Sequence, residues 1–341
     1  MSESQTSLAT QIRNATRKPV ETSLSTDQRV LARITDGIYR QPASALRELI
    51  SNAYDADATE VIILTDAPRF GQISVRDDGA GLSPEVLQHL IKHIGGSAKR
   101  TQEGKDLGVT DVDVNHSPGG RQLIGKMGIG LFSVAQFTRH FLIITKTKGD
   151  NHRTIADITL GPVTGGQPVL DLDSSGRREI ETGHARIWRE RADDIESHGT
   201  EIKLLELLPR TRAELASEDV WMKLELEKED PDAVATLPPK FHIGRMIPKQ
   251  TELLEVEPHL PWGEGENPSE RFASFVQAVR NSFLSDSDSV DLELLCDRYL
   301  RTIWDLAVSV PLRYFDRHPF DLTESSHFKF FELENKVQLL F

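Results

Sequence analysis

The segment that most constrains this 341-residue chain is residues 46–56, which read LRELISNAYDA. Residues four apart in a helix lie on one face, so a helix here would direct the carboxylate of Glu48 and the carboxamide of Asn52 to the same side. A buried stripe would be formed by Leu46, Leu49, Ile50 and Ala53. Pro42 suits the first turn of such a helix. Alone, this pair is typical of a solvated helix face, so a ligand site needs support from other segments.

Three later segments carry the signals of ligand-binding loops. Residues 72–76 alternate as a strand does and lead into residues 77–81, DDGAG, where two glycines allow a sharp turn and a close approach to a flat ligand. Residues 125–130, GKMGIG, open an apolar run with helical spacing, and such loops bind phosphate through free N–H groups. Gly199 and Thr200 begin a further alternating strand.

In this order the four segments resemble the GHKL ATPase superfamily. This is the Bergerat-fold group that includes the ninety-kilodalton heat-shock chaperones, type II topoisomerases, MutL, MORC proteins and histidine kinases. The resemblance covers roughly residues 28–207. Residues 46–52 and 124–133 are most similar to the chaperones, whereas residues 55–61 look more like MutL and MORC proteins, so the subfamily stays open.

The resemblance implies ATP and Mg²⁺ as cofactors and gives roles to individual residues. Glu48 would be the general base that activates the attacking water, and Asn52 would be a ligand of Mg²⁺, which prefers oxygen donors. Asp77 would accept a hydrogen bond from the adenine amino group. The other expected contacts to ATP are Gly79, Gly81, Gly125, Lys126, Gly128, Gly130 and Thr200.

The resemblance also implies a mobile lid over ATP at about residues 95–125. This stretch is rich in glycine and polar residues, a composition that packs weakly and can reorder. Lys99, Arg100 and Arg121 are candidates to reach phosphates from it, although basic residues in a loop are more often simply solvated. Asp55 lies roughly one turn beyond Asn52, and a role in supporting the metal site and a capping or surface role explain it equally well.

Three other functional motifs are each incomplete in this sequence. Residues 120–126 match a Walker A loop until Met127 occupies the place of the required Ser or Thr. His89 and His93 could share a helix face, but Leu90 replaces the Glu of a zinc-protease motif, so no metal site beyond Mg²⁺ is expected. A histidine kinase needs a phosphoacceptor histidine, usually upstream, and no histidine precedes His89.

We expect an α+β protein: a two-layer α/β sandwich of the Bergerat type, with a mixed sheet and helices on one face, followed by part of a second domain. The expected domains are a flexible segment at 1–25, an ATP-binding domain at 26–208, and a linker with the start of a second domain at 209–341. The apolar ending predicts an N-terminal fragment of a longer protein. Strands are expected at 60–64, 72–76, 141–147, 154–160 and 200–205, helices at 27–39, 84–94, 127–137, 218–232 and 291–310, and an interrupted polar stretch at 260–290.

Composition narrows the class of protein. The net charge of −13 and the pI near 5.4 do not favour generic DNA binding by the whole chain. Cys296 is the only cysteine, which excludes a disulfide framework within the chain and makes this residue a core position. No apolar run has transmembrane length and no signal-peptide core is present, so a cytoplasmic location away from membranes is expected.

The sequence therefore predicts an ATPase like the heat-shock chaperones, in which ATP closes a lid and a dimeric clamp and slow hydrolysis reopens it. The alternative is a MutL- or MORC-type ATPase acting in DNA transactions or defence. Histidine-kinase-like phosphotransfer and a nucleotide sensor without turnover are less favoured, the sensor because it could discard Glu48. A homodimer that forms on ATP binding is expected, while the client, protein or DNA, is left undetermined.

Overall fold

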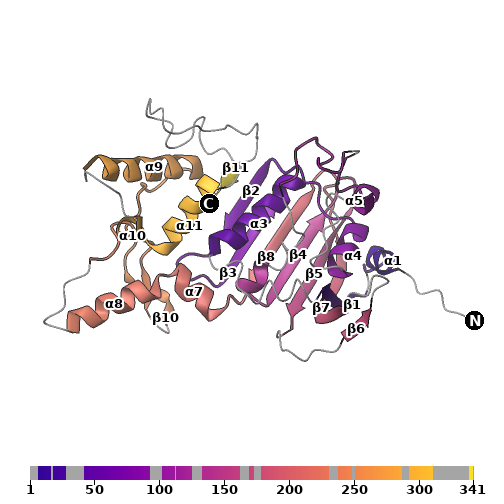
Figure 1. The fold of residues 1–341 in the computed structure, drawn as a ribbon, viewed down its shortest axis with the longest axis horizontal. Coiled ribbons are helices and arrows are strands. Elements are labelled where there is room, and N and C mark those ends of the chain that lie inside the picture. Colours follow the sequence, from indigo (N-terminus) through magenta and orange to yellow (C-terminus); the bar gives the residue numbers. More distant parts are fainter. Residues whose placement is uncertain are drawn as a thin grey trace, which may run out of the picture. The chain divides into compact units, whose positions relative to one another are not determined.

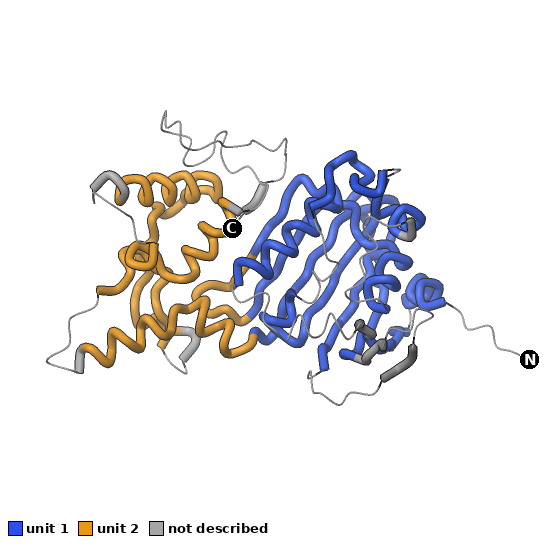
Figure 2. The backbone as a smooth tube through the Cα atoms, in the orientation of Figure 1, with its two compact units in different colours: residues 1–63, 72–207 blue, residues 64–71, 208–341 orange. Residues whose placement is uncertain are grey.

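A computed structural model describes residues 7–16, 18–27, 42–92, 102–111, 113–124, 133–161, 169–172, 178–229, 237–247, 250–285, 292–309 and 338–340. The chain divides into two compact units (Figure 2). Unit 1 comprises residues 1–63 and 72–207, and unit 2 comprises residues 64–71 and 208–341. The division after residue 207 lies next to the boundary expected at 208; the functional role of each unit stays a prediction.

A large sheet forms the frame of unit 1, in the strand order β1-β7-β5-β4-β8-β3-β2 with β6 paired to β7 (Figure 1). The strands are β1 (Val20–Asp27), β2 (Glu60–Leu64), β3 (Gln72–Asp77), β4 (His140–Lys146), β5 (His152–Leu160), β6 (Val169–Leu172), β7 (Arg178–Arg191) and β8 (Gly199–Leu205). Every pair whose register is determined is antiparallel. The mixed sheet expected from the sequence is therefore wrong for these strands. The short turn from β4 to β5 reverses the chain, which permits only an antiparallel pair.

Helices α3 (Pro42–Asp55) and α4 (Pro84–Lys92) lie across one face of this sheet (Figure 1). Unit 1 also contains α1 (Leu8–Arg13), α5 (Gln102–Asp106) and the 3₁₀ turn η1 (Val134–Gln136). Alternate residues of the central strands face the helices and are buried, for example Phe141 and Ile143 of β4. This layering gives the α+β arrangement with helices on a sheet.

The expected strands at 60–64, 72–76, 141–147, 154–160 and 200–205 are confirmed to within two residues, and so is the helix that begins at Pro84. The helix expected at 127–137 is described only from residue 133, where a 3₁₀ turn is present. The helix expected at 27–39 lies outside the described residues except for Asp27, which ends β1. Strands β6 and β7 were not expected, because β7 carries charged residues at its exposed positions and Gly183 within its length.

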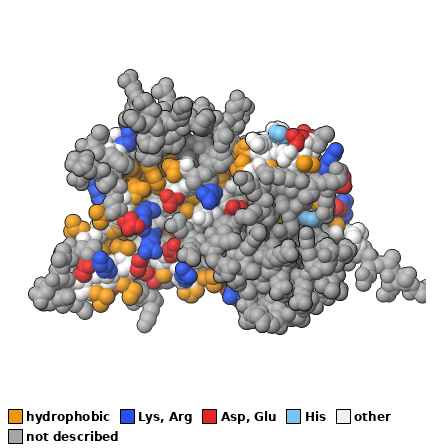
Figure 3. Space-filling model, viewed as in Figure 1, with side chains coloured by type: hydrophobic (Ala, Val, Ile, Leu, Met, Phe, Trp, Pro, Cys, Tyr) orange, Lys and Arg blue, Asp and Glu red, His pale blue; other side chains and the backbone are white. Residues whose placement is uncertain are grey.

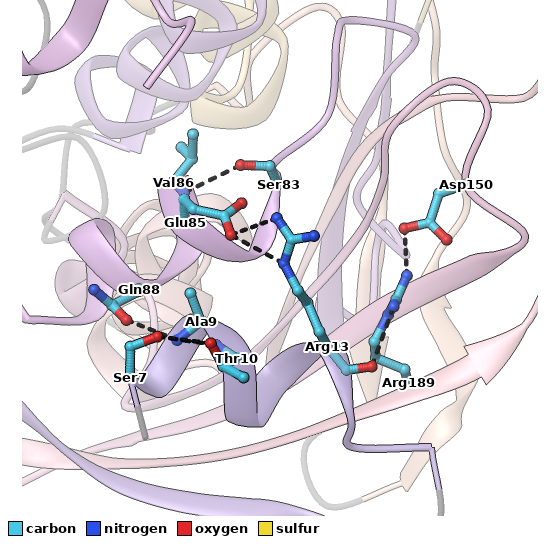
Figure 4. Close-up of polar contacts among 10 residues, drawn as sticks. All are labelled: Ser7, Ala9, Thr10, Arg13, Ser83, Glu85, Val86, Gln88, Asp150 and Arg189. Carbon is cyan, nitrogen blue, oxygen red and sulfur yellow. Dashed lines mark hydrogen bonds and ion pairs between the residues drawn. The ribbon is translucent and has the colours of Figure 1, made fainter. Parts of the chain in front are cut away.

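The N-terminal segment is not uniformly irregular, contrary to the flexible stretch expected at 1–25. Helix α1 buries Ile12 and Ala9, and β1 pairs along β7. Figure 4 shows how polar contacts hold α1: the Ala9 N–H donates to Gln88 of α4 at 2.7 Å, and Arg13 donates to Glu85 at 2.6 Å. Partial burial works to raise the pKa of Glu85, but the Arg13 hydrogen bond helps to hold it below its usual value. Polar composition hid these elements because each has few apolar residues, of which only Ala9, Ile12 and Leu24 are buried among the described side chains.

Unit 2 is mainly helical. Its elements are α7 (Pro209–Leu215), α8 (Glu218–Glu229), β9 (Arg245–Ile247), β10 (Gln250–Val256), α9 (Pro268–Ser285), α10 (Leu292–Leu295), α11 (Arg298–Ser309) and β11 (Gln338–Leu340). The acidic helix expected at 218–232 corresponds to α8. The single helix expected at 291–310 is broken before Arg298, where the Asp297 carboxylate accepts the Leu300 N–H at 2.8 Å and caps α11.

The interrupted polar stretch expected at 260–290 is corrected by α9, which spans 18 residues. Phe272, Phe275 and Val279 recur at helical spacing and are buried. The Phe275 ring lies 5.5 Å from the ring of Trp304 on α11, between centroids. Polar residues outnumber these buried positions along the segment. The polar composition therefore suggested an interrupted stretch, although the apolar residues have helical spacing.

Cys296, membrane-spanning helices and metal-binding clusters were also considered in the sequence. Cys296 is buried, and burial raises the pKa of its thiol to about 12, as expected for a core cysteine. Among the described residues, no helix is long and apolar enough to cross a bilayer. Within the same residues, no group of three or more His, Cys, Asp or Glu side chains is arranged to hold a metal ion.

Candidate functional site

Helix α3 places Glu48 and Asn52 as the sequence predicts. Leu46, Leu49 and Ile50 are buried on its inner side, which fixes the rotation of the helix against the sheet. Glu48 and Asn52, four residues apart, remain partly exposed. The two polar side chains therefore share a helix face that solvent reaches.

Asp77 is a partly buried carboxylate at the end of β3, directly across from Thr200 on β8. Its Oδ1 accepts two backbone N–H groups, from Gly79 at 2.9 Å and from Thr200 at 3.2 Å. Burial raises the pKa of Asp77 to about 6, against the lowering effect of these hydrogen bonds. Among the described residues, the second oxygen, Oδ2, makes no hydrogen bond, so it is available as an acceptor for a ligand.

Both glycines after Asp77 occupy positions where a side chain would collide. A Cβ on Gly81 would lie 2.1 Å from the Lys146 carbonyl oxygen, and its φ of +73° also favours glycine. A Cβ on Gly79 would lie 2.8 Å from the Ala56 carbonyl oxygen. Glycines that let the backbone close on a ligand are expected here; in the structure they also let the loop close on β4 and on Ala56, the residue after α3.

The strand β8 and its neighbour complete the polar end of the sheet. The Thr200 hydroxyl lies 3.0 Å from the Thr145 hydroxyl of β4, which accepts the Leu82 N–H at 2.7 Å. His198 Nδ1 lies 2.7 Å from the Gly79 carbonyl oxygen. Thr145 and His198 were missed by sequence reasoning. Thr145 could have been found as a polar residue in register with the buried positions of its strand.

The remaining site residues divide into two groups. Gly125, Lys126, Gly128 and Gly130 lie outside the described residues, as do Lys99 and Arg100. Arg121 is described, and its guanidinium donates to the Ala58 carbonyl at 2.7 Å and to the Tyr54 carbonyl at 3.3 Å. Asp55 Oδ1 accepts the Ile124 N–H at 2.9 Å. Both side chains therefore contact the protein backbone.

A separate hollow of about 380 Å³ lies over strands β1, β5 and β7. Its lining includes Glu21, Asp157, His184 and Arg186, a mixture of acidic and basic groups. None of the residues predicted to bind ATP takes part. The hollow is therefore distinct from the polar end of the sheet at Asp77.

The geometry unites a helix with Glu48 and Asn52, a strand ending in Asp77, and a Gly-Thr strand beside it. Residues 39–176 match the family model described as "Histidine kinase-, DNA gyrase B-, and HSP90-like ATPase". These residues belong to the GHKL ATPase family. Because unit 1 contains most of the matched residues, we use the name GHKL domain for unit 1 from here on. The match begins before the Glu48 helix and extends past the glycine-rich segment at 125–130.

Proteins of two kinds are similar to parts of this chain. The DNA mismatch repair protein MutL of Phenylobacterium zucineum is 44% identical over 64 residues, which are 18% of this chain and 10% of that protein. The endoplasmin homologue of Catharanthus roseus is 27% identical over 224 residues, 60% of this chain and 25% of that protein. The chain thus spans a quarter or less of these relatives.

Among solved structures, the Aquifex aeolicus MutL ATPase domain complexed with ADP is 19% identical to this chain. The match covers 56% of this chain and 55% of that one, with a TM-score of 0.29.

Proposed function

We propose that the chain binds ATP with Mg²⁺ in the GHKL domain and hydrolyses it slowly. ATP binding would close a lid and drive clamp-like dimerisation of a larger protein, in the manner of the Hsp90-like chaperones. The observation that carries this proposal is the arrangement of Asp77: one oxygen is held by two backbone N–H groups, and the other makes no hydrogen bond to the described residues.

That arrangement fits an adenine base. With Oδ1 fixed by Gly79 and Thr200, Oδ2 is presented in a defined direction and accepts from an amino group. Adenine offers an amino group at its six-position, whereas guanine has a carbonyl oxygen there, which an ionised carboxylate repels. A pKa of about 6 leaves Asp77 ionised at neutral pH. The pocket is therefore expected to prefer ATP to GTP.

Helix α3 supplies the groups for the triphosphate end. Glu48 would accept a proton from the attacking water, and Asn52 would offer its carbonyl oxygen to Mg²⁺. Because Asn52 is neutral, it adds an oxygen ligand without adding negative charge beside a triphosphate. When bound, the metal would neutralise phosphate charge. Gly125, Lys126, Gly128 and Gly130 are proposed to contact the phosphates.

A second candidate is a MutL- or MORC-type ATPase that acts in DNA transactions or defence, and the MutL match at 44% identity favours it. The net charge of −13 opposes generic DNA affinity. On the face drawn in Figure 3, the described acidic and basic side chains are interspersed. Binding of ATP-loaded protein to duplex DNA across a salt series would support this candidate, whereas suppression of client-protein aggregation would support the chaperone-like one.

The hydrolysis claim is tested with Glu48→Ala, measured by phosphate release and by ATP binding in parallel. We expect phosphate release to fall by about 10²-fold or more, the usual effect of removing a general base. Binding should change little, because the adenine contacts stay in place. Release at the wild-type rate would show that Glu48 is not the base.

A further inference from the structure

The C-terminal end of α3 and the residues that follow it, 55–59, contact two loops of the GHKL domain at once. We call residues 55–59 the α3 exit. On the adenine side, the Ala56 carbonyl accepts the Ala80 N–H at 2.9 Å, and the Thr59 N–H donates to Asp78 Oδ1 at 2.6 Å. The exit therefore fixes the glycine loop that follows Asp77.

On the other side, Asp57 of the α3 exit holds the segment of residues 113–124. Asp57 Oδ1 accepts the Ser117 hydroxyl at 2.5 Å, and Oδ2 accepts the Gly119 N–H at 2.7 Å. Ser117 is fully buried, and its Oγ also accepts the Arg121 N–H at 2.9 Å. A Cβ on Gly119 would lie 2.5 Å from Asp57 Oδ1, so a side chain at this position would collide with the carboxylate.

Two further contacts fasten the same segment. Arg121 donates to the Ala58 carbonyl and lies over the Tyr54 ring, with its guanidinium carbon 5.2 Å from the ring centroid. Asp55 accepts the N–H of Ile124, the residue directly before Gly125. Residues 117–124 are therefore attached to the helix that carries Glu48 and Asn52, rather than forming a free part of the lid expected at 95–125.

From these contacts we propose that Asp57 is a positioning residue for nucleotide binding. It holds residues 117–124 on the α3 exit, and this sets where the chain enters the glycine run at 125–130. The proposal rests on the proposed function, because it takes that run to contact the phosphates. Asp57 acts on the phosphate side alone: the adenine contacts come from Asp77, Gly79 and Thr200, which it does not touch.

The test compares Asp57→Gly with Asp57→Asn. Asp57 has a φ of +62°, which glycine and asparagine both tolerate, so neither variant strains the backbone. Glycine removes both side-chain hydrogen bonds and, as asparagine also does, the ion pair with Arg121, whose Nε lies 4.0 Å from Asp57 Oδ1. Asparagine keeps an acceptor for the Gly119 N–H, and its amide can donate to Ser117 Oγ, which has a second lone pair. The two variants thus differ in the contacts and not in the turn.

Calorimetry would measure the affinity of each protein for Mg-ATP and for adenosine. We expect Asp57→Gly to lose about tenfold or more in ATP affinity, the scale of one lost charge-assisted hydrogen bond. The affinity of Asp57→Gly for adenosine should stay within about twofold of the wild-type value. The affinities of Asp57→Asn for ATP and for adenosine should both stay within about threefold of the wild-type values. If Asp57→Gly does not fold, Ser117→Ala breaks one of the same contacts and is judged by the same ratio of ATP to adenosine affinity.

Equal losses for ATP and adenosine would overturn the proposal, since they would mean a general structural effect. Wild-type ATP affinity in Asp57→Gly would overturn it as well. Failure of the wild-type protein itself to bind ATP would instead remove the proposed function on which this inference stands.

Discussion

Asp77 gives rise to a prediction in which folding stability and ATP binding move in opposite directions. Asp77→Asn keeps the shape of the side chain and an oxygen that can accept the N–H groups of Gly79 and Thr200. It removes the buried charge and replaces one carboxylate oxygen with an amide donor. The adenine amino group would then face a donor where it needs an acceptor, so ATP affinity should fall.

The stability change follows from the pKa. Burial raises the pKa of Asp77 from 3.8 to about 6, so the folded state binds the proton more tightly than the unfolded state does. The stability linked to that proton is fully present below pH 3.8 and is lost as the pH rises through about 6. Two pKa units correspond to about 3 kcal/mol, and this is the cost of the ionised carboxylate at neutral pH. Asp77→Asn has no charge at this position and so avoids this cost.

The assay is thermal or urea unfolding of wild type and Asp77→Asn, without nucleotide, from pH 4 to pH 8. At pH 7.5 the variant should be the more stable protein by up to about 3 kcal/mol, or roughly 5 to 10 °C in Tm. The difference should shrink towards zero near pH 4. A variant that is no more stable than wild type at pH 7.5, or a difference that does not depend on pH, would show that the ionised Asp77 carboxylate does not destabilise the folded protein.

Four further outcomes are expected. In wild type, ATP affinity should weaken as the pH falls through about 6, because protonation of Asp77 turns the acceptor into a donor; a flat profile by calorimetry would argue against this contact. Gly81→Ala should destabilise the GHKL domain by about 2 kcal/mol or more in urea unfolding, since the new Cβ meets the Lys146 carbonyl and the φ is positive. Phe275→Ala should cost unit 2 about 3–5 kcal/mol by the same measurement, as it empties a fully buried aromatic site. Light scattering after addition of a non-hydrolysable ATP analogue should show a dimer, and a monomer at saturating analogue would contradict the clamp.

The sequence predicts those helices and strands whose apolar residues recur with a clear helical or strand period. Helix α3 combines an apolar stripe with a polar row, and strands such as β4 alternate clearly, so both were predictable. Elements whose stability comes from a few inward residues were not. Helix α9 has a buried aromatic face within a polar sequence, and β1 gains its place by pairing with β7.

The residues of the candidate site also divide into those that a local sequence pattern predicts and those that only the folded structure brings together. Glu48 and Asn52 follow from helical spacing, and Asp77 follows from a strand that ends at a glycine loop. Thr145 and His198 contribute through cross-strand and loop contacts that arise only when the sheet is assembled. Arg121 shows the converse: a basic residue in a glycine-rich loop suggested a phosphate contact, whereas the structure places it on the carbonyls at the end of α3.

The most direct test of ATP binding at Asp77 is a calorimetric titration of Mg-ATP into the wild-type protein and into Asp77→Asn, with Mg-GTP as the specificity control. We expect wild type to bind ATP and to bind GTP at least about tenfold more weakly, a difference of about 1.4 kcal/mol. Asp77→Asn should lose ATP affinity while remaining folded. Unchanged ATP affinity in Asp77→Asn would mean that the adenine binds elsewhere, and no binding of ATP by wild type would contradict the proposal that this chain is an ATP-binding protein.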